Sequence, residues 1–486
     1  MTESKIYHFV ASLSPVQINR LSRYLESPYF NRNDKLLAIY YKIEQHIRQN
    51  ITSELEKKEI WDQIYPNTLY KDDKFRKHCS ELLDLGEAFL AQQVYDDANL
   101  YQANFLLQAV HNLQIDRLYN SSQSKAELLL NRQSDRNPAY YYYRYEIEKN
   151  LYKLNNLEAS RANKTSFSKI NLDQIVNNLD YFYIAEKLKH YCNLLTWNLV
   201  FALDTKLLFI DEIISIARKE EFKEIPPIAI YLKIYETFVF PDNIKYYQEL
   251  NQLINNYLSC FPKDEAKEII EAAINYNIRN LNKGIEFQKQ LLEIYKKSLE
   301  QELIFVNDEL SPWTFKNIVT LSLRLKEVLW TEQFIKDYAP RLNSNYRENS
   351  VLYNTALIHY HKKEFDKVIP LLQKVAYEEI FYGLDSKTIL ISTYFELDED
   401  YALASLLDSF KNFLNRDKNL NQTKKVGYSN LVKFTKKLLD SSQDKEVNLV
   451  KLKQEVIDSN SYGKDWLLEK IDELMYSSST KQRKTK

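Results

Sequence analysis

The stretch that decides the fold is Val351–Val375, which reads VLYNTALIHYHKKEFDKVIPLLQKV. In its first half, small, apolar and aromatic side chains recur at steps of three and four residues, at Leu352, Ala356, His359 and Tyr360. The second half repeats this spacing at Phe365, Val368, Ile369, Leu372 and Val375. Such spacing places side chains on one stripe of an α-helix. The stretch therefore predicts two helices back to back, with Lys362-Lys363-Glu364 as the hinge.

The side chains on the two stripes differ in size. Ala356 is small and lies midway along the first stripe, whereas Phe365 and Leu372 are bulky. Large residues opposite small ones let two antiparallel helices interdigitate at roughly 8–10 Å between their axes. We therefore expect a tightly packed helical hairpin.

The hairpin resembles a tetratricopeptide repeat (TPR), whose pattern has a large apolar residue, a small one four later, an aromatic, and then an aromatic that opens the second helix. These positions hold Leu352, Ala356, His359-Tyr360, Phe365, Val368, Leu372 and Val375, over about 30 of 486 residues. Valines replace the usual alanines of the second helix, and Pro370 replaces a good helix former. The resemblance implies a scaffold that binds proteins or peptides on a concave face, lined here by Tyr353, Leu357, Tyr360 and His361.

Candidate hinges recur through the second half of the chain. They fall at Gly284, near Glu327, at Glu364 and at Glu399, separated by 43, 37 and 35 residues. Helix-pair repeats have periods of roughly 34–47 residues. The sequence thus predicts an all-α protein in which residues 172–475 form an α-solenoid of stacked antiparallel helix pairs, a TPR-like superhelix that follows an N-terminal helical domain.

Glycine is scarce, with 5 residues in 486, whereas average usage is near 7%. Few chain reversals can therefore use positive-φ glycine turns, which argues against a β-sandwich and against a Rossmann sheet. The glycines also form neither GxxxxGK nor GxGxxG, so a phosphate-cradling loop is excluded. The 37 tyrosines, the 23 phenylalanines and a hydrophobic content of 44% suffice for a substantial core.

Net charge and cysteine content limit the binding partners and the cellular compartment that we expect. The 66 basic and 67 acidic residues give a net charge of −1, which provides no global attraction to nucleic acid or to an anionic membrane. Cys79, Cys192 and Cys260 are far apart and form no CxxC, so we expect a reducing, cytoplasmic compartment. We find neither a signal peptide nor an uncharged apolar stretch of 18 residues, and we expect no membrane span.

Residues 1–95 are expected to form a domain of four helices, at Val16–Leu25, Asp34–Ile47, Lys57–Tyr65 and Asp72–Phe89. The short helix, the turn near Pro66 and the helix that carries Lys74, Arg76 and Lys77 are similar to a winged-helix DNA-binding domain, which implies DNA contact by these three residues. That fold needs a β-hairpin wing, but residues 88–110 keep apolar side chains at helical spacing. The alternative is a helical cap whose basic residues form a solvated face.

Four further segments complete the domain plan. Residues 96–154 are expected to be connecting helices, with Tyr140–Tyr143, Tyr145 and Tyr152 as either a packing face or an aromatic binding surface. Residues 155–171 are polar and predict a mobile linker. The helical-repeat domain follows at 172–475. The serine-rich, basic tail at 476–486 predicts a disordered end, with a weak polyanion contact as the alternative.

The chain lacks spacings typical of metal or catalytic sites. His359 and His361 are two residues apart, as are His190 and Cys192, and such pairs on a helix point to different faces. We therefore expect no metal, no cofactor and no enzymatic activity. Two hypotheses stay open: an interaction scaffold that binds a protein or peptide through the four residues named above, and a DNA-binding regulator with Lys74, Arg76 and Lys77 as its reader.

Overall fold

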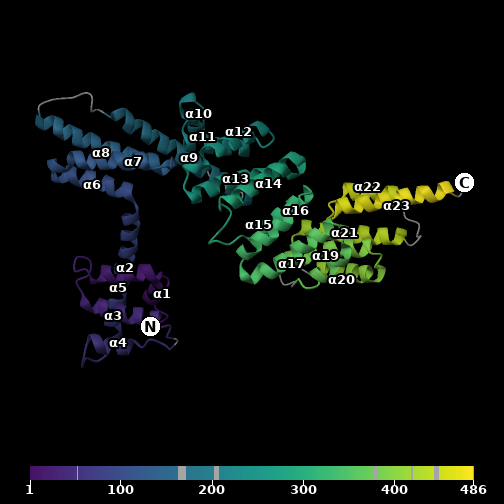
Figure 1. Cartoon of the computed structure of the whole chain (residues 1–486), viewed down its shortest axis with the longest axis horizontal. Helices are drawn as coiled ribbons and strands as arrows, with labels where there is room; N and C mark the ends of the chain where they lie inside the picture. The colour runs from purple at the N-terminus through teal and green to yellow at the C-terminus, as the bar shows by residue number, and fades with distance from the viewer. Residues whose placement is uncertain are drawn as a thin grey trace. The chain divides into compact units, whose positions relative to one another are not determined.

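Helices account for almost all of the regular structure (Figure 1). The structure, a computed structural model, describes residues 1–51, 53–162, 171–201, 207–375, 380–416, 420–442 and 448–484. None of these residues forms a β-strand; the nearest approach is one isolated antiparallel bridge between Val306 and Glu309. The prediction of an all-α protein is confirmed.

The chain divides into two units, and the first comprises Met1–Leu232 with Ser259–Phe261. Its helices carry two hydrophobic cores, one within α1–α5 and one within α6–α9. The helices are α1 Lys5–Ala11, α2 Pro15–Glu26, α3 Asp34–Arg48, α4 Lys57–Ile64, α5 Asp72–Asp97, α6 Asn99–Leu113, α7 Tyr119–Arg132, α8 Pro138–Ala162, α9 Leu172–Phe201, α10 Ile210–Ala217 and α11 Pro226–Val239, whose last residues belong to the second unit.

The N-terminal core has five helices rather than the four that we predicted. The additional helix, α1, begins after Ser4, whose side chain accepts a hydrogen bond from the Tyr7 backbone N–H. The ring of Phe9, on α1, lies against Gly86 of α5, where the Cβ atom of an alanine would be only 2.5 Å from the ring. Glycine in mid-helix normally costs stability, but here its missing side chain lets the two helices pack closely.

The tyrosine run on α8 is a packing face. Tyr140 and Tyr141 are buried, and Tyr142, Tyr143 and Tyr145 are half-buried. The Tyr141 ring makes an edge contact with Tyr181 of α9 at 5.5 Å between centroids. The run therefore joins α8 to its neighbours and offers no fully exposed aromatic surface.

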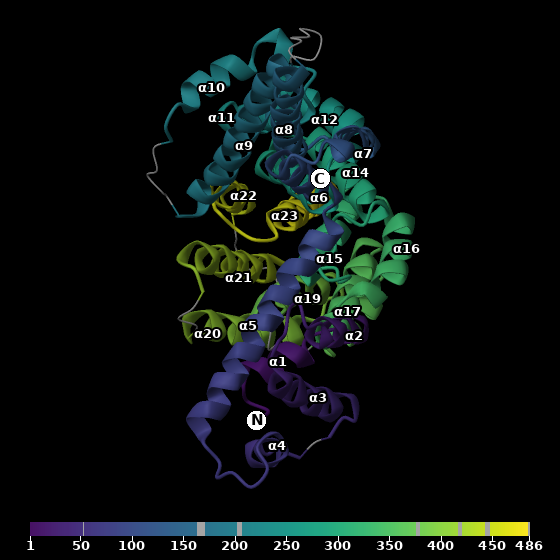
Figure 2. The ribbon, with the colours of Figure 1, turned by 90° about the vertical axis from the view of Figure 1, so that its left-hand side faces the viewer.

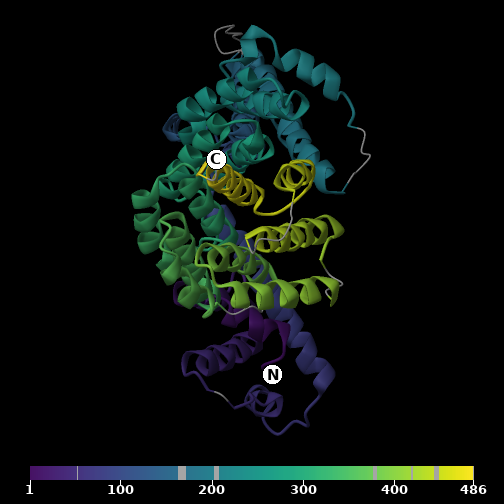
Figure 3. The ribbon, with the colours of Figure 1, turned by 90° about the vertical axis from the view of Figure 1, so that its right-hand side faces the viewer.

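The second unit comprises Lys233–Leu258 and Pro262–Lys486. Each helix from α13 onward contacts the next, and α15, α17, α19, α21 and α23 also form a row in which each contacts the following member. Figures 2 and 3 show these green and yellow helices from two opposite sides. The helices are α12 Ile244–Tyr257, α13 Lys263–Asn280, α14 Ile285–Glu300, α15 Pro312–Arg324, α16 Val328–Tyr338, α17 Ser344–His361, α18 Phe365–Leu372, α19 Ile380–Glu396, α20 Asp400–Arg416, α21 Gln422–Ser442, α22 Leu449–Asp458 and α23 Lys464–Lys484.

One backbone motif recurs at three of the predicted hinges. In each hinge the middle residue, which lies directly before the glutamate, has its backbone in the left-handed region, with φ of 62° at Lys326, 58° at Lys363 and 54° at Asp398. The next residue donates its N–H to the carbonyl five residues back in each case: Glu327 to Ser322, Glu364 to His359 and Glu399 to Tyr394, at 2.9–3.0 Å. This is the Schellman type of helix ending, and it occurs here without glycine.

The hinge geometry predicts that Lys326→Gly stabilises the chain. A left-handed conformation costs an L-residue roughly 1–2 kcal/mol, and glycine avoids this cost but loses more backbone entropy on folding. We expect the free energy of unfolding to rise by about 0.5–1 kcal/mol, measured by urea denaturation. Lys326→Ala removes the same exposed side chain and keeps the strained backbone, so an equal gain with alanine would contradict this explanation.

Four boundaries differ from the sequence expectations. We expected Gly284 to be the C-cap of the helix that precedes it; its backbone is extended, with φ 166°, and it is the N-cap of α14. Helix α8 continues through residues 155–162, which we expected to be linker, and residues 163–170 lie outside the described part. Helix α23 runs to Lys484 through most of the tail that we expected to be disordered. The two units meet after Leu232, well beyond the predicted linker.

Candidate functional site

The four predicted partner-binding residues all lie on α17, but only one is exposed. Tyr353 is 3% exposed, and its ring makes an edge contact with Tyr382 of α19 at 5.0 Å between centroids. Leu357 and Tyr360 are partly buried and pack on the same hydrophobic cluster of α17, α18 and α19. His361 is exposed at the end of the helix. Three of the four thus contribute to the packing of α17 against α18 and α19.

A polar cluster that includes Tyr353 is formed by four successive helices of the row, α15, α17, α19 and α21. The ammonium group of Lys316, on α15, lies 5.2 Å from the centroid of the Tyr353 ring and 5.6 Å from that of Tyr382. Lys316 also forms an ion pair with Asp385 of α19. Asp385 in turn accepts a hydrogen bond from the Tyr428 hydroxyl of α21, at 3.0 Å. Burial and the Asp385 charge hold the pKa values of Tyr353 and Tyr428 well above the ordinary range.

A strip of seven residues runs along α15 and α17, with Trp313, Lys316, Thr320 and Arg324 on α15 and Tyr353, Leu357 and His361 on α17; we call it the α15–α17 strip. Trp313, Arg324 and His361 are exposed, Lys316, Thr320 and Leu357 are partly buried, and Tyr353 is buried. Lys316 lies beside Tyr353 near one end, and Arg324 lies near His361 at the other. Partial shielding from water and the Arg324 charge both lower the pKa of His361. The strip therefore combines a half-exposed indole with a strong cation.

Helix α23 occupies the corresponding end of α19. Glu396, the last residue of α19, accepts hydrogen bonds from Trp466 and from the ammonium group of Lys470, both at 2.9 Å. The Lys470 side chain is only 8% exposed. Its burial disfavours the charge, but Glu473 and Glu396 outweigh this and raise its pKa. Our sequence reasoning missed Glu396 and Lys470, although alignment of the three hinges would have marked Glu396 as equivalent to Arg324 and His361.

The candidate DNA contacts lie on α5 and are engaged within the domain. Arg76 forms an ion pair with Asp72 at 2.7 Å, and Lys77 is 3.9 Å from Glu81. The ammonium of Lys74 lies 4.1 Å from the centroid of the Tyr65 ring. Helix α5 runs unbroken to Asp97 and α6 starts two residues later, so the described residues of this region contain no β-hairpin wing.

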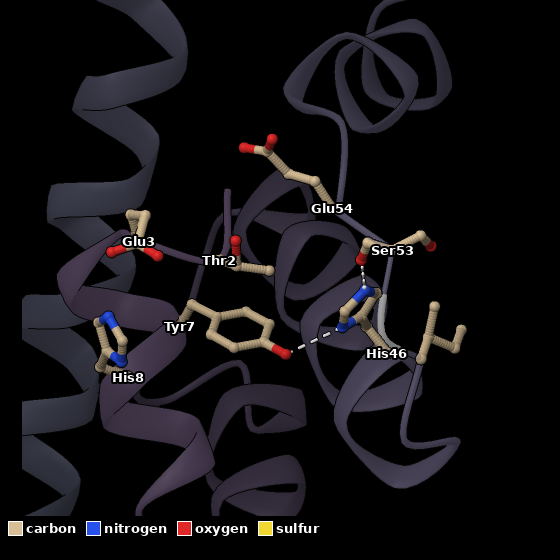
Figure 4. Close-up of a pocket in the computed structure, with 8 residues that line it drawn as sticks. Thr2, Glu3, Tyr7, His8, His46, Ser53 and Glu54 are labelled. Atoms are coloured by element: carbon tan, nitrogen blue, oxygen red, sulfur yellow. Dashed lines mark hydrogen bonds between the residues drawn. The ribbon is translucent and has the colours of Figure 1, made fainter.

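An open hollow of about 350 Å³ lies beside α1 and α3 in the N-terminal core (Figure 4). Tyr7 reaches across it and its hydroxyl lies 2.9 Å from Nδ1 of His46, while Nε2 of His46 donates to the Ser53 carbonyl at 2.8 Å. Glu3, His8 and Glu54 are among the other lining residues. Because the fold engages both ring nitrogens of His46, the imidazole acts as a link between α1, α3 and the turn that follows.

The described residues contain neither a metal-binding cluster nor a membrane-spanning helix. In the described part of the chain, no group of three or more His, Cys, Asp or Glu side chains is arranged to hold a metal ion. Over the same residues, no helix is long and apolar enough to cross a membrane. The α15–α17 strip, with its exposed aromatic and basic side chains, is therefore our candidate functional site.

Comparisons with protein-family models, with curated proteins and with solved structures found no match for this chain.

Proposed function

We propose that the second unit is a helical-repeat array of the TPR-like type, and that the protein is a non-enzymatic scaffold that binds a protein or peptide segment along the α15–α17 strip. The single observation that carries the proposal is the row formed by α15, α17, α19 and α21. In stacked helix pairs, the first helices of successive pairs line one surface, and each repeat contacts mainly its neighbours. The recurring hinge supports the same arrangement.

The strip has the chemistry of a peptide-binding surface. Trp313 is 50% exposed, and tryptophan and arginine are the side chains that most often dominate binding energy. Leu357 and Thr320 are only partly buried between the two ends. The three free cysteines suit a reducing, intracellular setting. We favour this function over a DNA-binding regulator because α5 is followed directly by α6, and the described residues of this region contain no β-hairpin wing.

The proposal predicts that Trp313→Ala releases bound proteins without unfolding the chain. The full-length protein, this variant and a matched control would be used as bait, and co-purifying proteins quantified by mass spectrometry. The control is Leu329→Ala, which removes an 82% exposed side chain from α16, outside the row. We expect recovery of at least one partner to fall roughly tenfold for Trp313→Ala, since such residues contribute about 1–2 kcal/mol or more, and to stay unchanged for Leu329→Ala. Equal recovery by all three baits, with unchanged circular dichroism, would exclude the strip.

A further inference from the structure

The last residues of three helices in the row occupy equivalent positions. Arg324 ends α15, His361 ends α17 and Glu396 ends α19, and each is followed by the same hinge with a left-handed middle residue. Equivalent positions in stacked repeats present their side chains to the same side of the array. Arg324 and His361 are close enough that the charge of one lowers the pKa of the other.

The structure shows how one of these positions is recognised. At the end of α19, Glu396 is met by the Lys470 ammonium and by the Trp466 indole N–H, both from α23. The Trp466 ring also makes an edge contact with Phe395 at 5.4 Å between centroids. Helix α23 thus docks on the end of α19 through a group of opposite charge, Lys470, next to an aromatic ring, Trp466.

Of the two neighbouring positions, Arg324 is exposed and carries the opposite charge, and neither Arg324 nor His361 has an acidic ion-pair partner among the described residues. Two acidic side chains, at the start of the next helix and within it, form ion pairs with other residues: Glu327 pairs with Lys296, and Glu332 pairs with Lys362. An unpaired guanidinium beside an imidazole is suited to a carboxylate, which arginine binds through two parallel hydrogen bonds.

We infer that the segment bound by the α15–α17 strip is acidic, with a carboxylate against Arg324 and His361 and an apolar side chain against Trp313. This inference rests on the proposed function. Residues 313–324 cover roughly 16–17 Å of helix at 1.5 Å per residue, and an extended chain covers that distance in about five residues. The ligand is therefore a short extended peptide of another protein, acidic at one end and apolar at the other.

The test is selection of a random heptapeptide phage library on the immobilised full-length chain at low salt, repeated on Trp313→Ala and on two further variants. Arg324→Glu with His361→Ala inverts the site. Lys336→Glu makes the same change in net charge on the exposed surface of α16. We expect the wild type and Lys336→Glu to enrich peptides that carry Asp or Glu. We expect the inverted variant to lose these peptides, with affinities weaker by roughly tenfold or more, and to enrich Lys or Arg instead, because like charges at an interface are strongly unfavourable.

The outcomes separate this inference from the function on which it depends. Enriched peptides without acidic residues, lost on Trp313→Ala, would support the scaffold and overturn the acidic partner. Acidic peptides that the inverted variant retains would place the binding site elsewhere and overturn the inference as well. No enrichment above a blank surface for any bait would contradict both. Circular dichroism of the variants checks that each result reports binding rather than unfolding.

Discussion

Tyr353→Ala is expected to lower the free energy of unfolding by about 3–5 kcal/mol, as is usual when a buried aromatic residue is truncated. The Tyr353 ring is almost fully buried and contacts both Tyr382 of α19 and the Lys316 ammonium of its other neighbour, α15. Its removal leaves a cavity and also deprives the Lys316–Asp385 ion pair of its aromatic cover. Urea denaturation followed by circular dichroism measures the change.

Tyr353→Phe is the matched control. Phenylalanine keeps the ring, its contact with Tyr382 and most of the buried volume, so we expect a loss below about 1.5 kcal/mol, as for other volume-conserving substitutions. A loss for Tyr353→Ala below about 0.5 kcal/mol would mean a surface position and would contradict the packing of α17 against α19. The prediction also means that Tyr353 is unsuitable as a binding-site variant, because we expect its loss to disrupt the packing of α17 against α19.

Lys470→Ala is expected to cost about 3–5 kcal/mol, the usual result of removing one partner of a buried ion pair. The substitution leaves Glu396, itself 18% exposed, with the Trp466 N–H but without a neutralising cation. The first turns of α23 should then detach from α19. Hydrogen exchange of the peptides that cover α19 and α23 would report this loss directly, and urea denaturation would give its magnitude.

Two controls isolate the effect of burial. Lys453→Ala removes another lysine that pairs across α22 and α23, with Asp472 at 2.6 Å, but both side chains are substantially exposed. Exposed pairs contribute only about 0.2–1 kcal/mol, so its effect should be small. Glu396→Leu with Lys470→Met replaces the whole pair by apolar residues and should recover most of the loss. If Lys470→Ala and Lys453→Ala were equally mild, α23 would not be anchored through Glu396.

The helical hairpin at Val351–Val375 could be predicted because its information is local. The stripe through Leu352 and Ala356 and the charged hinge Lys362-Lys363-Glu364 correspond to α17, the turn and α18. Phe365, however, is only half-buried, with its ring 5.7 Å from that of Tyr360. Periodicity identifies the face that packs, but it does not give the depth of burial, which depends on the helices that cover that face.

The candidate site could be predicted only in part. The sequence placed Tyr353, Leu357, Tyr360 and His361 on one helix, and the TPR-like pattern suggested that they were accessible. The structure packs Tyr353 against Tyr382 of α19, later in the chain, and brings Lys316 beside it from α15, earlier in the chain. No sequence spacing within one helix could show that these residues meet. Likewise, α1 was missed because its apolar stretch is short, although Ser4 provides a cap.

By itself the sequence determined the class of fold: few glycines and apolar side chains at helical spacing predict an all-α protein. Those features are local, because hydrogen bonds between residues a few positions apart and side-chain periodicity are enough to produce helices. Tertiary structure alone decided which polar groups are buried, which are paired and which are exposed, as in the contrast between Glu396, held by Lys470, and Arg324, which has no acidic partner in the described part of the chain. The reason is that burial and charge pairing depend on residues some 70 positions apart, which only the packing of helices brings together.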